Sequence, residues 1–232
     1  MIPTYAIFKE SLVQAQALAK KGYKPDCLAG FSLGEITALA FAGVFADDEI
    51  VKVRATAMQE CCEQTNGTMI AVLRLERVID FTGAYPVNFN SPEQIVYSMD
   101  AGKANAFIAE VAEKGGRAVR LKVAGAFHSP HMQDATDKVA AYLANIELGK
   151  PKIPVYSNIT AQPYHGDYKL LISKQISNPV KWQQTIENML ADGVDTFIEC
   201  GPGNVLCGLV KKIAEARGVA DKIKIQKAED LL

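Results

Sequence analysis

A serine between two glycines is the first residue of this chain whose surroundings suggest chemistry. Residues 30–35 read Gly-Phe-Ser-Leu-Gly-Glu, which has the G-x-S-x-G spacing of a nucleophile elbow. In such an elbow the serine lies on a sharp turn between a strand and a helix, with its hydroxyl clear of the packed layers. The start of that helix would also favour negative charge developing near Ser32. The alternative is a glycine-flanked turn in which the serine only caps the helix.

A serine nucleophile needs a base that accepts its proton, and histidine is the usual base near neutral pH. The chain has three histidines, His128, His131 and His165. His131 begins a predicted helix, and His165 lies in a polar turn. His128 lies on a loop where the chain would re-enter its main body, which suits a residue that reaches over a cleft. Taken alone, each histidine is more often structural than catalytic, so the interpretation of His128 depends on the segments around it.

The elements that would position these residues alternate between strands and helices. Apolar strand-like runs occur at 24–29, 153–157 and 196–200. Helical patterns cover residues 5–21, 35–42, 48–64, 131–146, 179–190 and 204–216. This alternation predicts an α/β fold, with a mostly parallel sheet flanked by helices as in hydrolases.

The middle of the chain has a different pattern of predicted strands and helices. Strand-like runs at 68–73, 94–99 and 117–123 surround an amphipathic helix at 103–114. We expect these elements to form a small α+β, ferredoxin-like subdomain over residues 66–125. It would be inserted into a large catalytic subdomain made of residues 1–65 and 126–232.

The composition excludes several classes of protein. The 232 residues are 49% hydrophobic and 22% charged with a formal net charge of −1, so no overall field favours nucleic acid or a membrane surface. The five cysteines are scattered and form no C-x-x-C pair, so neither a metal site nor a disulfide framework is predicted. No apolar run is long enough to span a bilayer, and charged residues break any signal-peptide core near the start. We expect a cytoplasmic protein.

Several further segments accompany the serine elbow in a fixed order along the chain. Together they resemble the malonyl-CoA:acyl carrier protein transacylases and the related acyltransferase domains of polyketide synthases. Because the matching segments span nearly the whole chain, they are far more specific than one elbow. They are Gly30 to Glu35, Arg54 with Met58 and Gln59, Val87 to Pro92, Ala126 to Met132, Gln175 with Asn178 to Trp182, and Glu199 to Leu206.

The resemblance implies a reaction in two transfers. Ser32 would take the malonyl group from coenzyme A as an ester, and His128 would accept the hydroxyl proton and return it to the leaving thiol. The acceptor would be the phosphopantetheine thiol of an acyl carrier protein, in fatty-acid or polyketide synthesis. No cofactor or metal is implied. The backbone N–H of Leu33 would stabilise the oxyanion, and the backbone carbonyl of Gln175 would orient His128, a role that leaves the Gln175 side chain free to vary.

Three more residues receive roles from the resemblance, and each has a simpler reading. Arg54 would hold the malonyl carboxylate, because a guanidinium can make two parallel hydrogen bonds to it; otherwise it is a surface arginine on a helix. Phe127 would crowd out branched substrates; otherwise it belongs to the core. Asn90 would lie near the bound acyl group; otherwise it is a routine turn residue.

The chain departs from the family pattern in three places. Phe31 stands where the family usually has histidine, and the segment between Leu75 and Pro86 is shorter than usual. The sequence also contains no G-Q-G-x-Q motif, which in the family follows the first strand and serves the oxyanion hole. We therefore expect a missing strand and loop, weakened activity and an open sheet edge. Three explanations stay open: the gene is truncated, another polypeptide supplies the segment, or a neighbouring chain covers the edge.

Other functions remain open from the sequence. A serine esterase fits the elbow, although its histidine normally follows an acid late in the chain. A patatin-like Ser-Asp hydrolase would use Asp192, which precedes Gly193 in an apparent turn. A third reading is a weakly active fragment that binds a carrier protein or partner subunit. The sequence does not distinguish fatty-acid from polyketide synthesis, name the carrier-docking residues or set the oligomeric state.

Overall fold

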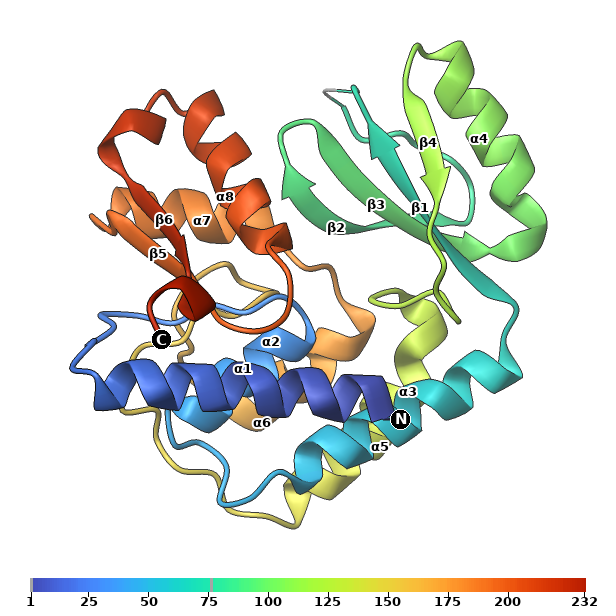
Figure 1. Ribbon diagram of the computed structural model, residues 1–232. Coiled ribbons are helices and arrows are strands. Elements are labelled where there is room, and N and C mark those ends of the chain that lie inside the picture. Colours follow the sequence, from blue (N-terminus) through green and yellow to red (C-terminus); the bar gives the residue numbers. More distant parts are fainter. Residues whose placement is uncertain (1, 76) are drawn as a thin grey trace.

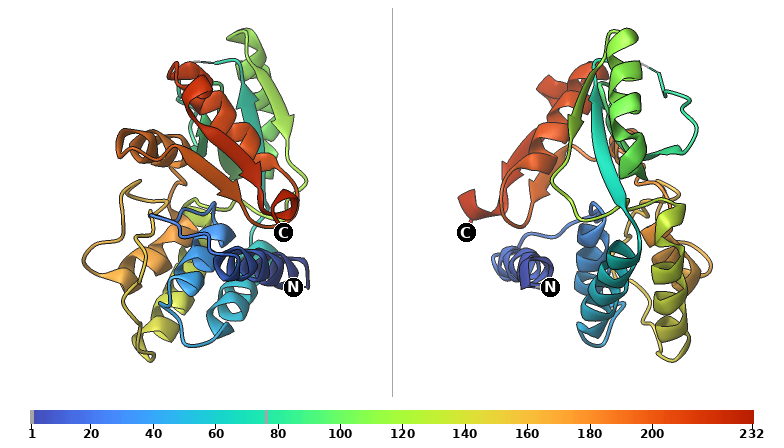
Figure 2. Two further views of the ribbon diagram at one scale, coloured as in Figure 1. Left: turned by 60° about the vertical axis from the view of Figure 1, so that its left-hand side comes forward. Right: turned by 90° about the vertical axis from the view of Figure 1, so that its right-hand side faces the viewer.

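The main body is a cluster of helices packed against short parallel strand pairs. The computed structural model describes residues 2–75 and 77–232 (Figure 1). Helix α1 crosses over α2, and α3 packs along α5 (Figures 1 and 2). Buried apolar side chains such as Ile36, Leu39, Ile50, Val139 and Leu143 form the core between them. The helices are α1 (Ile2–Lys20), α2 (Leu33–Phe41), α3 (Glu49–Gln64), α5 (Gln133–Ala144), α6 (Tyr168–Lys174), α7 (Trp182–Ala191) and α8 (Val205–Ala216).

The strands of the body are short and pair in parallel. β5 (Thr196–Glu199) lies beside β6 (Lys224–Lys227). The predicted strands at 24–29 and 153–157 meet in a single parallel bridge between Leu28 and Val155, where Leu28 N donates to Pro154 O at 2.8 Å. The α/β class predicted from the sequence is confirmed, although these two strands are shorter than their apolar runs indicate.

An antiparallel sheet with one helix forms the upper right of Figure 1. Its strands are β1 (Gly67–Leu73), β2 (Ala84–Ser91), β3 (Gln94–Asp100) and β4 (Arg117–Arg120), in the order β2-β3-β1-β4, and α4 (Ala104–Glu113) covers one face. This is the order of a ferredoxin-like sheet. Strand β2, which forms a hairpin with β3, was not predicted as a separate strand. Between β1 and β2, residues 77–83 contain no helix.

Side chains along β1 point alternately to the two faces of the sheet, and both faces are apolar. Ile70 and Val72 face α4, where they pack with Tyr97 and Phe107. Met69 and Ala71 belong to a second cluster on the other face, against which Phe127 packs. The sheet is therefore joined to the chain around His128 through its second face.

Backbone contacts also fix the sheet against the body. On β2, Val87 O accepts from Val180 N at 2.7 Å, and Phe89 N donates to Val180 O at 3.0 Å. Where β1 begins, a Cβ on Gly67 would lie 2.5 Å from Ala126 N, so only glycine allows this close approach. These contacts hold the segments at 126 and 180 in place, and both adjoin the residues singled out from the sequence.

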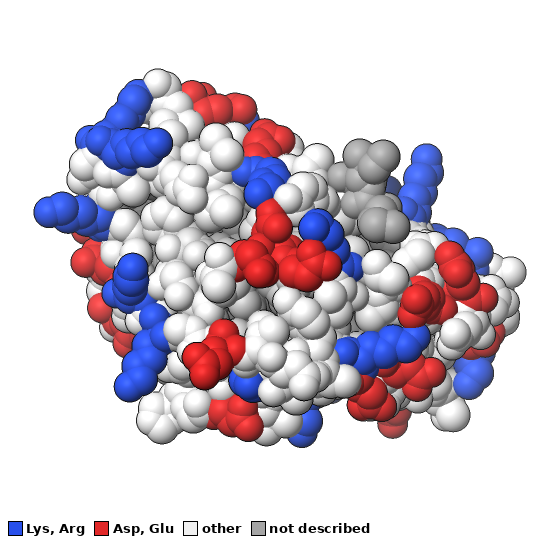
Figure 3. Space-filling model, turned by 90° about the horizontal axis from the view of Figure 1, so that it is seen from below, with Lys and Arg blue, Asp and Glu red and all other residues white. Residues whose placement is uncertain are grey.

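The remaining structure consists of short 3₁₀ turns and loops. These turns are Ala101–Lys103, Pro130–Met132, Gln175–Ser177, Ala220–Lys222 and Ala228–Asp230. Within residues 2–75 and 77–232, none of the helices is both long and apolar enough to cross a bilayer. The face in Figure 3 carries acidic and basic side chains interspersed, in keeping with the net charge of −1.

Candidate active site

Ser32 lies on the sharp turn that the glycine spacing predicts. Its φ of 52° and ψ of −102° lie outside the usual regions for a residue with a side chain, and α2 starts at Leu33. The turn is tight because a Cβ on Gly30 would lie 1.9 Å from the carbonyl carbon of Gly34. Gly30 must therefore be glycine, and the strained serine backbone has the form of a nucleophile elbow.

The side chain of Asn158 fixes the elbow from the neighbouring loop. Its Oδ1 accepts from Ser32 N at 2.8 Å, and its Nδ2 donates to Gly30 O at 2.7 Å. Asn158 is buried and follows directly after the chain that pairs with Leu28. Sequence reasoning missed this residue, although its place just beyond a predicted strand next to the elbow strand was an available signal.

His128 joins the serine to the segment at Gln175. Its Nε2 lies 2.8 Å from Ser32 Oγ, and its Nδ1 lies 2.9 Å from Gln175 O. A carbonyl only accepts, so Nδ1 carries the proton and Nε2 is free to accept the serine proton. His128 has a φ of 60°, and its N–H donates to Ile176 O at 3.1 Å. The two residues predicted to act together are thus within hydrogen-bond distance.

The protonation state of His128 suits a base. Burial, together with the nearby charge of Arg54, lowers the pKa of His128 to about 4, although the hydrogen bond that His128 donates to Gln175 O acts in the opposite direction. The imidazole is therefore neutral at pH 7. A neutral imidazole oriented by a carbonyl can accept the Ser32 proton without first losing one of its own.

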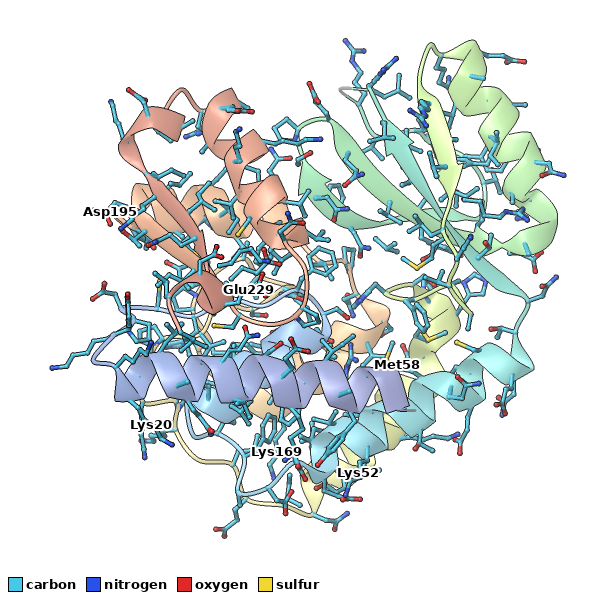
Figure 4. The ribbon with its side chains drawn as sticks, viewed as in Figure 1. Lys20, Lys52, Met58, Lys169, Asp195 and Glu229 are labelled. Carbon is cyan, nitrogen blue, oxygen red and sulfur yellow. The ribbon has the colours of Figure 1, made fainter. Side chains whose placement is uncertain are left out.

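Arg54 is buried on α3 and points at the serine. Its Nη2 donates to Ser32 Oγ and to Gln175 Oε1, both at 3.0 Å. Its Nε has no acceptor in the part of the chain that the structure describes. Burial lowers the pKa of Arg54 to about 10, so the side chain stays cationic at pH 7. On the same helix, Lys52 lies at the surface and Met58 packs on the core (Figure 4).

The Gln175 side chain makes hydrogen bonds of its own, beyond the carbonyl role expected from the sequence. Its Nε2 donates to Ser32 O at 2.7 Å and to Glu35 Oε2 at 2.9 Å, while its Oε1 accepts from Arg54. Glu35 is fully buried and also accepts a hydrogen bond from Tyr164 OH. Burial raises the pKa of Glu35 to about 7, against the opposing effect of these hydrogen bonds. Only the backbone carbonyl of Gln175 entered the prediction, so these side-chain contacts were not foreseen.

The other residues predicted to serve the site are Leu33, Phe127 and Asn90. Leu33 N, at the start of α2, has no acceptor among the described residues and can donate to an oxyanion. Phe127 is half-buried beside His128, and its carbonyl accepts from Ser98 Oγ at 2.6 Å. Asn90 lies on β2 and donates to Gln94 Oε1 at 3.0 Å. Across residues 2–75 and 77–232, Asn90 makes no hydrogen bond to the serine, the histidine or Arg54.

The contacts of Asp192 and His128 bear on the two alternative predictions, a patatin-like Ser-Asp hydrolase and a serine esterase. Asp192 accepts a hydrogen bond from Tyr156 OH and makes none to Ser32 or His128 within the described chain. The partner of His128 Nδ1 is a carbonyl and not a carboxylate. In the same described residues, no group of three or more His, Cys, Asp and Glu side chains is arranged to hold a metal ion.

The site combines a half-buried serine, a buried histidine, an adjacent guanidinium and a free N–H at a helix start. Within an α/β fold, these groups define a serine-dependent acyl-transferring protein. The family model described as "Acyl transferase domain" matches residues 5–227. "Malonyl CoA-acyl carrier protein transacylase" of Bacillus subtilis is 35% identical over 225 residues, covering 90% of this chain and 71% of the relative. The chain therefore belongs to the acyl transferase family, among the malonyl-CoA:acyl carrier protein transacylases.

Solved structures agree with this assignment. The malonyl CoA-acyl carrier protein transacylase of Clostridium perfringens has a TM-score of 0.88 and 32% identity, covering 97% of this chain and 74% of that one. A malonyl-transacylase in complex with a type II PKS acyl-carrier protein has a TM-score of 0.87 and 29% identity, with 97% and 75% covered. The fold predicted from the sequence is that of these enzymes.

Proposed function

We propose that this chain transfers a malonyl group from coenzyme A to the phosphopantetheine thiol of an acyl carrier protein, through an ester on Ser32. The observation that carries the proposal is the position of His128 between Ser32 Oγ and the Gln175 carbonyl, with Arg54 beside the same hydroxyl. The named relatives and the complex with a carrier protein support the same donor and acceptor.

The first transfer forms the acyl-enzyme. His128 Nε2 takes the proton from Ser32 Oγ as the oxygen attacks the thioester carbonyl. Negative charge develops on the carbonyl oxygen, where Leu33 N–H and the start of α2 stabilise it. The carbon–sulfur bond then breaks, and the coenzyme A thiolate takes the proton from His128. In the second transfer, the carrier thiol gives its proton to His128 and attacks the ester carbonyl. The carbon–oxygen bond to Ser32 then breaks, and Ser32 Oγ takes the proton back from His128.

Arg54 is the residue we propose for the malonyl carboxylate. Its guanidinium reaches Ser32 Oγ, so it lies within reach of an acyl group attached to that atom. Binding a free carboxylate would provide the acceptor that its buried Nε lacks. Phe127 would border the acyl group on the side of His128. For Asn90, the buried Oδ1 without a hydrogen bond supports a place near the acyl group.

The wider organisation follows from the same proposal. We propose a large catalytic subdomain of residues 1–65 and 126–232 and a small one of residues 66–125, each with its own apolar core. The substrates would be malonyl-CoA and the carrier's phosphopantetheine arm, with no further cofactor, and the reaction would take place in the cytoplasm.

Radiolabelled malonyl-CoA tests this function. The protein is incubated with the labelled thioester, then with a phosphopantetheinylated acyl carrier protein, and label is followed on each. We expect label on the enzyme and then on the carrier, and none with Ser32→Ala. Label that stays with coenzyme A would favour the binding-only reading, and hydrolysis of simple esters with no thioester preference would favour an esterase.

The Arg54→Lys variant tests whether Arg54 binds the malonyl carboxylate. Lysine keeps the charge but cannot make the two parallel hydrogen bonds, so we expect roughly a tenfold loss of malonyl labelling. Equal labelling by acetyl-CoA and malonyl-CoA in the unsubstituted protein would remove Arg54 from this role.

A further inference from the structure

Glu35 is a buried carboxyl group that the mechanism above does not use. It lies in the first turn of α2, three residues after Ser32, and is fully buried. No lysine or arginine side chain forms an ion pair with it within the described residues. The charge of Arg54 favours the ionised carboxylate, but the cost of burial outweighs it, so stability alone does not explain a glutamate here. Its two contacts, Tyr164 OH and Gln175 Nε2, point to another purpose.

The contact with Glu35 decides which way the Gln175 amide faces. The amide has two N–H donors, and both are taken, one by Ser32 O and one by Glu35 Oε2. The amide oxygen must then face the other side, where it accepts from Arg54 Nη2. A reversed amide would place N–H groups against the guanidinium, which has only donors. The ionised form of Glu35 only accepts, so it excludes the reversed orientation of the amide.

Tyr164 in turn holds the carboxyl group. Its hydroxyl donates to Glu35 Oε1, while the other carboxyl oxygen receives the Gln175 amide. A line of hydrogen bonds therefore runs from Tyr164 through Glu35 and Gln175 to Arg54. It ends at Ser32 Oγ, which Arg54 Nη2 also contacts.

We propose that Glu35 is a positioning residue that, through the side chain of Gln175, holds Arg54 beside Ser32 and so favours acyl groups that carry a free carboxylate. The inference rests on the proposed malonyl transfer and deepens it. Glu35 touches no reacting atom, and its effect passes through the Gln175 amide and the guanidinium. The selectivity of the site for the acyl group therefore begins outside the residues that meet the substrate.

Rates of Ser32 labelling from malonyl-CoA and from acetyl-CoA test the proposal in the full chain. The variants are Glu35→Leu, which removes the acceptor, and Glu35→Gln, which keeps an acceptor oxygen on a side chain of the same length. We expect Glu35→Leu to lower malonyl labelling about tenfold more than acetyl labelling, chiefly by raising KM, since a hydrogen bond to a charged group is lost. Glu35→Gln should recover most of that difference.

Two further variants complete the design. Tyr164→Phe removes only a hydroxyl and should shift the malonyl-to-acetyl ratio in the same direction by a smaller factor, which decides the matter if Glu35→Leu does not fold. Gln64→Met alters an exposed glutamine at the end of the helix that carries Arg54 and should leave the ratio unchanged.

The outcomes separate this inference from the proposed function. If the unsubstituted protein shows no label on Ser32, malonyl transfer itself fails and the inference fails with it. If Ser32 is labelled but both thioesters lose rate in parallel in Glu35→Leu and Tyr164→Phe, Glu35 is only structural and the inference alone is overturned. A selective loss of malonyl labelling, recovered in Glu35→Gln, supports it.

Discussion

Two regions of the molecule are held together in opposite ways. One is the sheet of β1 to β4 with α4, and the other is the surroundings of Ser32. The sheet has regular antiparallel registers over an apolar core that includes Ile70, Tyr97 and Phe107. Around Ser32 the buried groups are largely polar or ionisable. They are Glu35, Arg54, His128, Asn158 and Gln175.

The backbone shows the same contrast. Ser32 and His128 both have positive φ values, 52° and 60°, although neither is glycine. Such conformations cost on the order of 1–3 kcal/mol each and persist only where the surroundings enforce them. Here the enforcing contacts come from distant segments, namely Asn158 on Ser32 and Ile176 on His128. One region is thus built for stability, and the other holds strained groups in place for chemistry.

The largest expected effect separates chemistry from stability at the serine. Ser32→Ala should lower acyl transfer on the order of 10⁴-fold or more, because the nucleophile is gone. Its free energy of unfolding should fall by only about 1–3 kcal/mol, since the hydroxyl loses one hydrogen bond with His128 and one with the cationic Arg54. Malonyl transfer kinetics and urea unfolding measure the two quantities. A loss of several kcal/mol would break the contrast between the regions.

The opposite pattern is expected for the sheet. Phe107→Ala should lower the free energy of unfolding by about 3–5 kcal/mol, because it empties a fully buried aromatic position. The fraction that remains folded should label Ser32 at the unsubstituted rate. Urea unfolding and single-turnover labelling, corrected for the folded fraction, check this. A selective loss of rate in folded protein would mean that the sheet contributes to catalysis directly.

Asn158→Ala should affect both quantities moderately. It leaves Ser32 N and Gly30 O without their partners, which costs about 1–3 kcal/mol of unfolding free energy. It also loosens the elbow, so acylation should slow roughly tenfold or more. Asn145→Ala, at an exposed asparagine that bonds only to its own helix, is the matched control. Identical results for the two variants would exclude Asn158 as a brace of the elbow.

The smallest effect is a displacement of the pH profile. The pKa of His128 is lowered to about 4 from 6.5, mainly by burial, so the acid limb of kcat/KM should fall well below pH 6.5. The neutral form of His128 is favoured in the fold. Its contribution to stability is therefore complete above pH 6.5 and is lost as the pH falls through about 4. Rates of Ser32 labelling between pH 4 and 9 measure this.

The pKa of Glu35 is shifted in the opposite direction from that of His128, so the pH profile needs a control for Glu35. Its pKa is raised to about 7, mainly by burial, so its contribution to stability is present below its ordinary value of 4.5 and is lost as the pH rises through about 7. An inflection near pH 7 should disappear in Glu35→Gln while the limb assigned to His128 remains. An acid limb at 6.5 in both proteins would show that His128 is not shifted.

The sequence predicts the parts of this molecule that depend on local pattern. The glycine spacing predicts the elbow, and the family motifs bring Ser32, His128 and Arg54 to one place, where the structure also puts them. Periodicity predicts the longer helices within a few residues, but the short helix α6 was not predicted. The runs at 24–29 and 153–157 form only one bridge, because apolar content does not say how many backbone partners a strand will find.

What escaped prediction depends on contacts between distant residues. Asn158 reaches Ser32 across 126 positions, and the Gln175 side chain reaches Glu35 across 140. No periodicity or spacing connects such pairs, since a buried polar side chain finds its partner only when the whole fold is assembled. The two regions differ in this respect too. Three strands of the sheet and its helix follow from their pattern, whereas the polar cluster follows from the fold.

The most direct test of the account is peptide mapping by mass spectrometry after brief exposure to malonyl-CoA. The account predicts one malonyl group on the peptide that contains Ser32, formed quickly in the unsubstituted protein and at least a thousandfold more slowly, on the order expected for loss of the base, in His128→Ala. Malonyl attached at another residue, or labelling of Ser32 at the same rate without His128, would contradict it.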